Sequence, residues 1–183
     1  TGSPRPVVST SLQVGSDFVQ NTRYRVQVDA HGYISSIYDR LSSRELVNAA
    51  NPDDFNRLCP GAAGLESFAG GHHIQPDPTV TNISTGQTGP VAASLRIDNP
   101  GHPMESVDIV LYENLNRIDI VDRVNRESFD MTGQTLAVSF PLNLAGAHAR
   151  IDTPAGWHNP SNAIETLAGA SKHAYGMDHA LDL

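Results

Sequence analysis

The chain has 183 residues, of which 39% are hydrophobic and 17% charged, enough apolar content for one globular domain but too little charge for long solvated helices. Its formal net charge of -8 disfavours nucleic acid as a partner, because the phosphate backbone would be repelled. The 12 prolines and 15 glycines punctuate the chain as in an all-β protein with many turns.

No apolar run approaches the roughly 20 residues needed to span a bilayer, so we predict no membrane partner. The first residues lack the charged and apolar regions of a signal peptide. Cys59 is the only cysteine, which excludes an intrachain disulfide and a cysteine-based zinc site within one chain. We interpret Cys59 as a small core or loop residue, and a lone cysteine without a secretion signal favours the cytoplasm.

Residues 1–20 are predicted to be a linker or an edge strand, because Val8, Thr10, Leu12 and Val14 alternate only weakly. The chain start, Thr1, has the character of the cut end of a longer chain.

Residues 21–47 predict an antiparallel meander. Period-two alternation over 24–28 indicates a strand with one dry face. Gly32 then makes a tight connection and is expected at positive φ. The second strand, 33–38, slips in its alternation, which indicates a bulge, and a short third strand begins at 45–47.

This meander resembles the start of the C-terminal β-sandwich region in glycoside hydrolase family 38, the α-mannosidases. The likeness is to a segment of the type Asn-x-x-Tyr-x-Val-x-Val-Asp, followed by Gly-x-Ile-x-Ser-Ile-Tyr-Asp and Arg-Glu-Leu. It is carried by Asn21, Tyr24, Val26, Val28, Asp29, Gly32, Ile34, Ser36, Ile37, Tyr38, Asp39, Arg44, Glu45 and Leu46.

The middle of the chain predicts further strands. Residues 48–90 are poor in periodic structure and predict a long loop with one short strand at 80–83. Strands are expected at 89–97, 107–112, 118–124 and 136–142, and one or two helical turns at 162–168. Their predicted inward residues are Val91, Ala93, Leu95, Ile97, Val107, Ile109, Leu111, Leu136, Val138 and Phe140.

Several of these strands also match the family. Residues 89–97 resemble its Gly-Pro-Val-x-Ala-Ser-Leu-Arg-Ile segment, and 111–119 its Leu-Tyr-x-x-x-x-Arg-Ile-Asp segment. In the second of these, Arg117 and Asp119 share one side of a strand, where they can pair. Residues 137–141 resemble its Ala-x-x-Phe-Pro segment, and 149–156 continue the likeness.

The resemblance implies an all-β fold: an antiparallel β-sandwich with long loops and little helix, part of a galactose-mutarotase-like supersandwich. Residues 21–183 would be this domain, truncated at its C-terminal end. The implied function is a non-catalytic portion of an α-mannosidase that supports the catalytic domain and lends loop residues to the rim of the sugar pocket. An open alternative is a stand-alone carbohydrate-binding or structural β-sandwich.

In family 38 the zinc ion and the aspartate nucleophile belong to the preceding catalytic domain, where two Asp and two His bind the metal. Those segments have no counterpart here, so no cofactor is expected in this chain, zinc is expected in the parent, and the chain alone is predicted to be inactive. The implied partners are an α-mannoside, through the parent enzyme, and a second copy or the missing part of the parent.

Asn56 and Arg57 are the first candidates for the rim of the sugar pocket, because they stand after the third strand, where the family can reach the substrate. Here Leu58-Cys59 replaces the family's aromatic run, so no substrate-binding tyrosine is carried over. Trp157 is the third candidate, because an exposed indole can stack on a sugar ring, although a Trp that closes the end of a sandwich is the simpler reading.

His72 and His73 are weak metal candidates in the long loop, and no tight zinc binding is expected from them. Asp53-Asp54, with Asp29 or Asp39, could be offered as a carboxylate pair for glycoside hydrolysis. Adjacent acids in loops are common, however, and hydrolysis needs a fixed separation across the scissile bond. We therefore assign no catalytic residue.

Overall fold

The computed structural model describes residues 9–61, 76–128, 135–146, 150–153, 156–159 and 181–182. These residues form an all-β, antiparallel sandwich, as the sequence predicted. Helical structure among them is one turn of 3-10 helix, η2 at Arg126–Ser128. No helix in this described part is long and apolar enough to cross a membrane.

The first sheet has five strands, which pair in chain order from β1 to β5. Every neighbouring pair is antiparallel, so each connection is a local hairpin or turn. The strands are β1 (Gln13–Val14), β2 (Phe18–Gln20), β3 (Tyr24–Val28), β4 (Ile34–Asp39) and β5 (Arg44–Glu45). β1 is an edge strand of this sheet, and β2 is a strand that the sequence did not predict.

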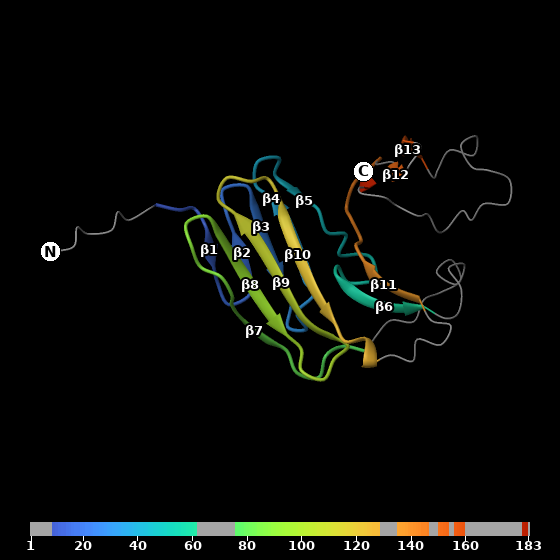
Figure 1. Ribbon diagram of the computed structural model, residues 1–183. Helices are drawn as coiled ribbons and strands as arrows, with labels where there is room; N and C mark the ends of the chain where they lie inside the picture. Colours follow the sequence, from blue (N-terminus) through green and yellow to red (C-terminus); the bar gives the residue numbers. More distant parts are fainter. Residues whose placement is uncertain are drawn as a thin grey trace.

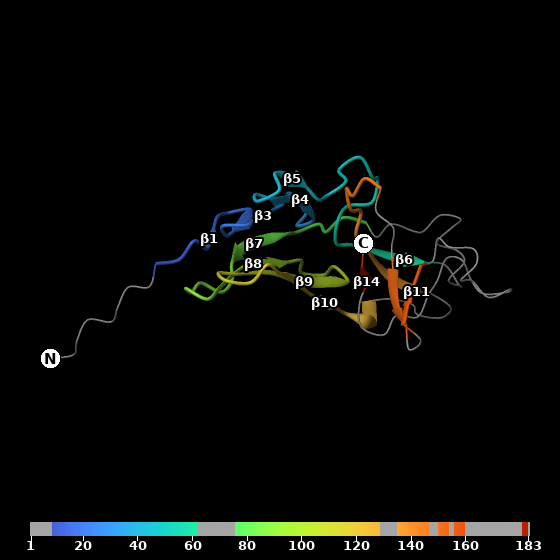
Figure 2. The same cartoon turned by 90° about the horizontal axis from the view of Figure 1, so that it is seen from above.

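The second sheet has four antiparallel strands in the order β10-β9-β8-β7. Figure 1 shows it in front of the first sheet, and Figure 2 shows the two sheets as stacked layers. Its strands are β7 (Asn82–Thr85), β8 (Ala92–Asp98), β9 (Met104–Tyr112) and β10 (Ile118–Val124).

Two smaller sheets follow. β6 (Arg57–Gly61) pairs with β11 (Thr135–Ser139), and β12 (Arg150–Thr153) lies between β13 (Gly156–His158) and β14 (Leu181–Asp182). The β6–β11 pair joins the end of the first sheet through two isolated bridges, Ile34 to Phe55 and Val47 to Leu142.

The core lies between the two main sheets. Val19 and Val26 from the first sheet are fully buried, as are Leu95, Ile97 and Ile109 from the second. These side chains belong to one continuous apolar cluster. Burial of this apolar surface is the main stabilising term for a sandwich, at about 25 cal/mol for each Å² removed from water.

The predicted irregularity in the second strand is a β-bulge at Ser35. Val28 pairs with Ile34, whereas Gln27 pairs with Ser36, so Ser35 has no partner on β3. The extra residue lets Ile34 and Ile37 both face the core, at 2% and 5% exposure. The prediction is confirmed.

Gly32 takes φ +85° in the β3–β4 turn, as predicted. A Cβ atom placed there would lie 2.5 Å from Cγ2 of Ile97 on the opposite sheet. Two separate effects therefore favour glycine, namely the left-handed backbone and the close approach of the second sheet.

We expect Gly32→Ala to lower the free energy of unfolding more than Gly101→Ala does. Gly101 has a similar φ of +80° but nothing within 4 Å of its Cβ position, so it reports backbone strain alone. That strain costs about 1–2 kcal/mol, and overpacking against Ile97 adds about 1 kcal/mol at position 32. Urea unfolding followed by circular dichroism measures both, and equal losses would refute the contact with Ile97.

Two residues predicted to face inward do not. Val91 is 73% exposed because β8 begins only at Ala92, so Val91 stands in the loop before the strand. Phe140 is 50% exposed because β11 ends at Ser139, before the proline. In both cases the alternation of apolar and polar residues in the sequence extends one residue beyond the strand that forms hydrogen bonds with its neighbour. The strand predicted at 80–83 is observed two residues later, as β7.

The long loop predicted for 48–90 is also shorter than expected, because it contains β6 as well as β7. The sequence did not predict β6, because two of its residues, Pro60 and Gly61, are typical of a turn. The helical turns predicted at 162–168 lie outside the described residues.

Candidate functional site

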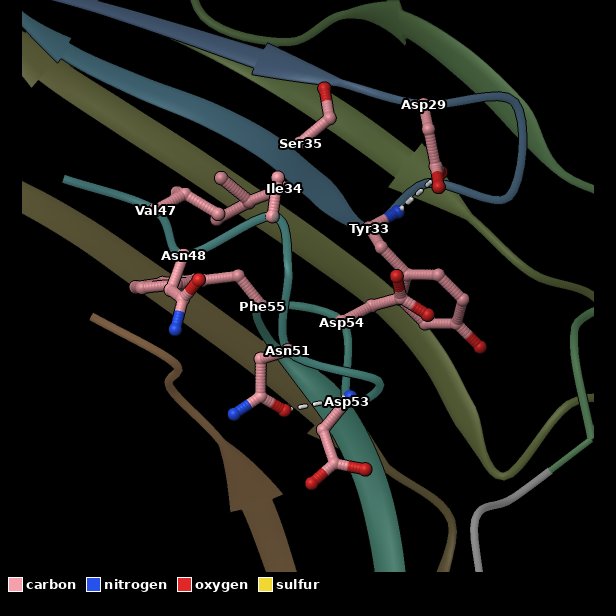
Figure 3. A pocket seen from close by; sticks show the side chains of 11 residues that line it. Asp29, Tyr33, Ile34, Ser35, Val47, Asn48, Asn51, Asp53, Asp54 and Phe55 are labelled. Carbon is pink, nitrogen blue, oxygen red and sulfur yellow. Dashed lines mark hydrogen bonds between the residues drawn. The ribbon is translucent and has the colours of Figure 1, made fainter. Parts of the chain in front are cut away.

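A pocket of about 110 Å³ opens where the β3–β4 hairpin meets the segment between β5 and β6. We call it the loop pocket, and Figure 3 shows the side chains around it. The hairpin supplies one wall and the segment 47–55 supplies the other. Its lining residues are Asp29, Tyr33, Ile34, Ser35, Val47, Asn48, Ala49, Asn51, Asp53, Asp54 and Phe55.

Short side chains with oxygen acceptors fix the pocket loops. Oδ1 of Asp29 accepts the backbone N–H groups of His31 and Tyr33, at 2.9 and 3.0 Å. Asn48 and Asn51 each accept the backbone N–H two residues further on, at 3.2 and 2.9 Å. Asn and Asp favour such turns because their side chains replace a backbone acceptor. The walls are therefore held by the sequence of the loops themselves.

The floor of the pocket is apolar and rigidly placed. Ile34, Val47 and Phe55 are at most 5% exposed, and the backbone N–H of Ile34 donates to the carbonyl of Phe55 at 3.1 Å. Phe55 also makes a T-shaped contact with Phe140, which lies outside the pocket lining, with ring centroids 5.2 Å apart. The loop pocket therefore combines an aromatic floor with a polar rim.

Arg57 lies beside the loop pocket and is held by carboxylates. Its guanidinium pairs with Asp54 at 2.6 Å and with Asp77 at 2.7 Å, and its side chain is only 13% exposed. The same group lies over the ring of Tyr33, 5.0 Å from its centroid. Arg57 thus contacts both Asp54 and Tyr33 and stabilises the wall of the pocket to which these two residues belong.

Burial raises the pKa of the Tyr33 phenol well above its ordinary value. The positive charge of Arg57 opposes this rise, and the negative charge of Asp77 adds to it. The hydroxyl itself is buried without a hydrogen bond of good geometry to any described residue. Tyr33 is therefore neutral at physiological pH and can act only as a neutral hydrogen-bonding group.

Asn56 adjoins the loop pocket but turns away from solvent. It is 2% exposed, and its φ of +66° is a left-handed conformation that Asn tolerates better than most residues. Nδ2 donates to Oδ1 of Asp122 on β10 at 2.9 Å, while Oδ1 has no partner among the described residues. Asn56 therefore connects the start of β6 to the second sheet.

Asp122 is an inward-facing carboxylate, because it pairs with Val107, a core residue of β9. Burial raises the pKa of Asp122, and the hydrogen bond from Asn56 lowers it without reversing the rise. Above its folded-state pKa, Asp122 is charged in a partly buried place, which reduces stability.

We expect Asp122→Asn to stabilise the protein at neutral pH by about 0.5–1.5 kcal/mol, because an amide can accept from Nδ2 of Asn56 and also donate to its unpartnered Oδ1. The gain should shrink as pH falls and Asp122 takes up its proton, and vanish below the ordinary value of 3.8. Urea unfolding between pH 3.5 and 7 measures this. In an Asn56→Ala background the part of the gain that comes from the new hydrogen bond should be lost, while the part that comes from removing the charge should remain. A neutral or destabilising effect at pH 7 would contradict the expectation.

The candidate site residues named from the sequence do not lie together in one site. Asn56 and Arg57 lie next to the loop pocket, one buried and one largely buried. Trp157 stands on β13 with its backbone paired to Asp152, and nothing is described of its side chain. His72 and His73 lie outside the described residues.

Cys59 is 4% exposed, and burial raises the pKa of its thiol. A raised pKa disfavours the reactive thiolate, in keeping with the core role predicted for this residue. Among the described residues, no three His, Cys, Asp or Glu side chains are placed to hold a metal ion.

Sequence reasoning named Asp29, Asp53 and Asp54 only as possible catalytic acids, and it missed Asn48 and Asn51. The density of Asn and Asp between 48 and 54 was the available signal for a structured loop. No model of a known protein family matches the sequence, and no curated protein matches it.

Proposed function

We propose that this chain is a non-catalytic β-sandwich portion of a family 38 α-mannosidase, which supports the catalytic domain of its parent. The observation that supports the proposal is that polar residues of the family-like segment make the hydrogen bonds that shape the meander β3–β5, which this segment forms. A segment that serves to build a sandwich is expected to keep these residues for packing and hydrogen bonding.

Asn21 shows this most clearly. It is 2% exposed, its Oδ1 accepts the N–H groups of Arg23 and Tyr24 at 2.9 and 2.6 Å, and its Nδ2 donates to the carbonyl of Tyr112 at 2.8 Å. Asn21 thereby shapes the turn before β3 and also ties the first sheet to the second.

Asp39 and Glu45 perform similar tasks at the other end of the meander. Oδ1 of Asp39 accepts the N–H of Leu41 at 2.9 Å in the β4–β5 turn. Oε1 of Glu45 accepts the N–H groups of Ile37 and Val47, both at 2.9 Å. Burial alone would raise the pKa of Glu45, but these hydrogen bonds and one from a serine hydroxyl lower it overall. Both carboxylates are thus engaged as structural acceptors.

The later matches fall on the second sheet. The segment 89–97 forms most of β8, between β7 and β9. Arg117 and Asp119 pair at 2.8 Å, as expected from the sequence, and the hydroxyl of Tyr112 donates to Asp119 at 2.6 Å. The Leu-Tyr-x-x-x-x-Arg-Ile-Asp likeness therefore corresponds to a cross-strand cluster of the β9–β10 hairpin.

Contact with the rest of the parent forms part of this proposal. Within the described residues, β10 pairs on one side only, and Ile118, Ile120 and Val124 on its inner face are only partly buried. A sheet edge of this kind favours a further strand or a covering surface. An association between two copies of the chain would meet the same need.

We expect the isolated chain not to hydrolyse α-mannosides, because the family's zinc ligands and nucleophile belong to another domain. The measurement is release of 4-nitrophenol from 4-nitrophenyl α-mannopyranoside by highly purified protein, with and without added zinc. Turnover that persists through purification, and that falls in Asp53→Asn or Asp54→Asn variants, would refute the non-catalytic assignment.

A second candidate function is a carbohydrate-binding module, and the observation that favours it is the loop pocket with its amide and carboxylate rim. The two functions differ in what the free chain should do. A purely supporting sandwich binds no sugar by itself, whereas a binding module does.

A further inference from the structure

The loop pocket has hydrogen-bonding capacity that the fold leaves unused. The Oδ1 atoms of Asp29, Asn48 and Asn51 each accept hydrogen bonds from backbone N–H groups. No described residue bonds to Oδ2 of Asp29 or to Nδ2 of Asn48 and Asn51. The pocket therefore offers free donors as well as free acceptors, which is the mixture that a hydroxyl group can satisfy, since it both donates and accepts.

The acidic lining of the pocket favours a neutral ligand over an anion or a divalent cation. Asp29, Asp53 and Asp54 all line the pocket, and none of the described lining residues is cationic. The nearby Arg57 is already paired with Asp54 and Asp77, so the pocket disfavours an anion. A divalent cation needs several converging oxygen ligands, and no three acidic or histidine side chains of the described residues are so placed. A neutral ligand with several hydroxyl groups fits both observations.

An apolar surface beside the polar rim points to a ring rather than a small alcohol. The apolar floor is formed by Ile34, Val47 and Phe55. The half-exposed Phe140, which does not line the pocket itself, lies against Phe55. The backbone N–H of Asn48 donates to the carbonyl of Pro141 at 2.8 Å, which ties the segment carrying Phe140 to the pocket loop. Aromatic rings next to polar groups suit ligands that have both C–H faces and hydroxyl edges.

We propose that the loop pocket binds one neutral sugar ring of pyranose size. Asn48 and Asn51 donate to its hydroxyl oxygens, Oδ2 of Asp29 accepts from one of its hydroxyl groups, and its C–H face packs over Val47 and Phe55 on the pocket floor. The volume of about 110 Å³ is room for several water molecules, which one such ring would displace. This binding does not depend on the supporting role in the parent; it rests on the second candidate function, the binding module, and adds to it the class of ligand and the residues that hold it.

The test is a titration of the isotope-labelled chain with methyl α-mannopyranoside, methyl α-glucopyranoside and methyl α-galactopyranoside, followed by amide chemical shifts. A ligand of this size with few contacts should bind with a dissociation constant on the order of 1 mM. The shifts should be confined to residues 29–35, 47–55 and 140–142. Calcium chloride and inorganic phosphate, titrated separately, should leave these amides unchanged.

Two neighbouring alanines provide a matched pair of variants. Ala49 and Ala50 are both exposed in the same loop, but only Ala49 lines the pocket. We expect Ala49→Phe to weaken sugar binding at least tenfold and Ala50→Phe to leave it within twofold. Asn48→Asp keeps the acceptor for the loop N–H but loses the donor, so it should also weaken binding, with an unchanged spectrum elsewhere.

The proposal is overturned if no sugar shifts the pocket amides, if the shifts lie elsewhere on the sandwich, or if Ala49→Phe and Ala50→Phe bind alike. It is also overturned if calcium moves the same amides and the sugars do not. Failure here leaves the supporting role intact, because that role requires no binding by the free chain. If the chain binds sugar in the pocket and its full-length gene encodes no catalytic domain, the pocket proposal is supported and the family assignment is refuted.

Discussion

Replacement of Ile109 by alanine should lower the free energy of unfolding by about 2–5 kcal/mol. Ile109 is fully buried in the middle of β9 and pairs with Leu95 on one side and Ile120 on the other. The loss combines the apolar surface no longer buried with the cavity left between two sheets that cannot collapse onto it.

Urea unfolding followed by circular dichroism gives this value, and Val121→Ala is the matched control. Val121 stands on the neighbouring strand β10 but is 44% exposed, so its truncation should cost less than about 1 kcal/mol. Similar losses for the two variants would mean that the core does not lie between the sheets as described.

Replacement of the buried Asn21 by leucine should cost about 3–5 kcal/mol, because three partly buried backbone groups lose their partner at once. These are the N–H groups of Arg23 and Tyr24 and the carbonyl of Tyr112. Leucine has a similar size, so it excludes the water that could otherwise replace the amide.

The control for Asn21→Leu is Thr22→Leu, which introduces the same side chain at the next, exposed position. This second change should alter stability by no more than about 0.5 kcal/mol. If Asn21→Leu were equally mild, the amide would not connect the two sheets, and the structural reading of the family-like segment would lose its main support.

Apart from β2, the strands of the two main sheets could be predicted from the sequence, most of them because their apolar residues alternate with period two. Val26 and Val28 on β3, and Leu95 and Ile97 on β8, show the pattern and are buried as expected. The positive φ of Gly32 could be predicted for a different reason, since a very short connection between strands requires a residue that accepts this conformation.

The limits of the sequence are equally specific. β6 was missed because Pro60 and Gly61 lie within it, and pairing with β11 overrides their weak local preference. Phe140 was placed inside the core because alternation alone does not show where a ladder ends. In each case the outcome was decided by a partner strand distant in sequence.

The candidate site was harder still to foresee, because it depends on contacts between distant segments. The loop pocket exists because the Ile34–Phe55 bridge brings the hairpin turn to the segment before β6. Asn56 meets Asp122 across 66 residues of chain, and no local pattern indicates that pair. The turn-forming role of Asn48 and Asn51 could have been read locally, but their common pocket could not.

The proposal that the chain is the supporting sandwich of a larger α-mannosidase is tested most directly by the sequence of the messenger RNA upstream of the codon for Thr1. We expect one continuous reading frame that encodes an α/β domain with two Asp and two His in zinc-ligand segments. A reading frame that starts immediately before Thr1, or one that encodes an unrelated domain, would contradict it.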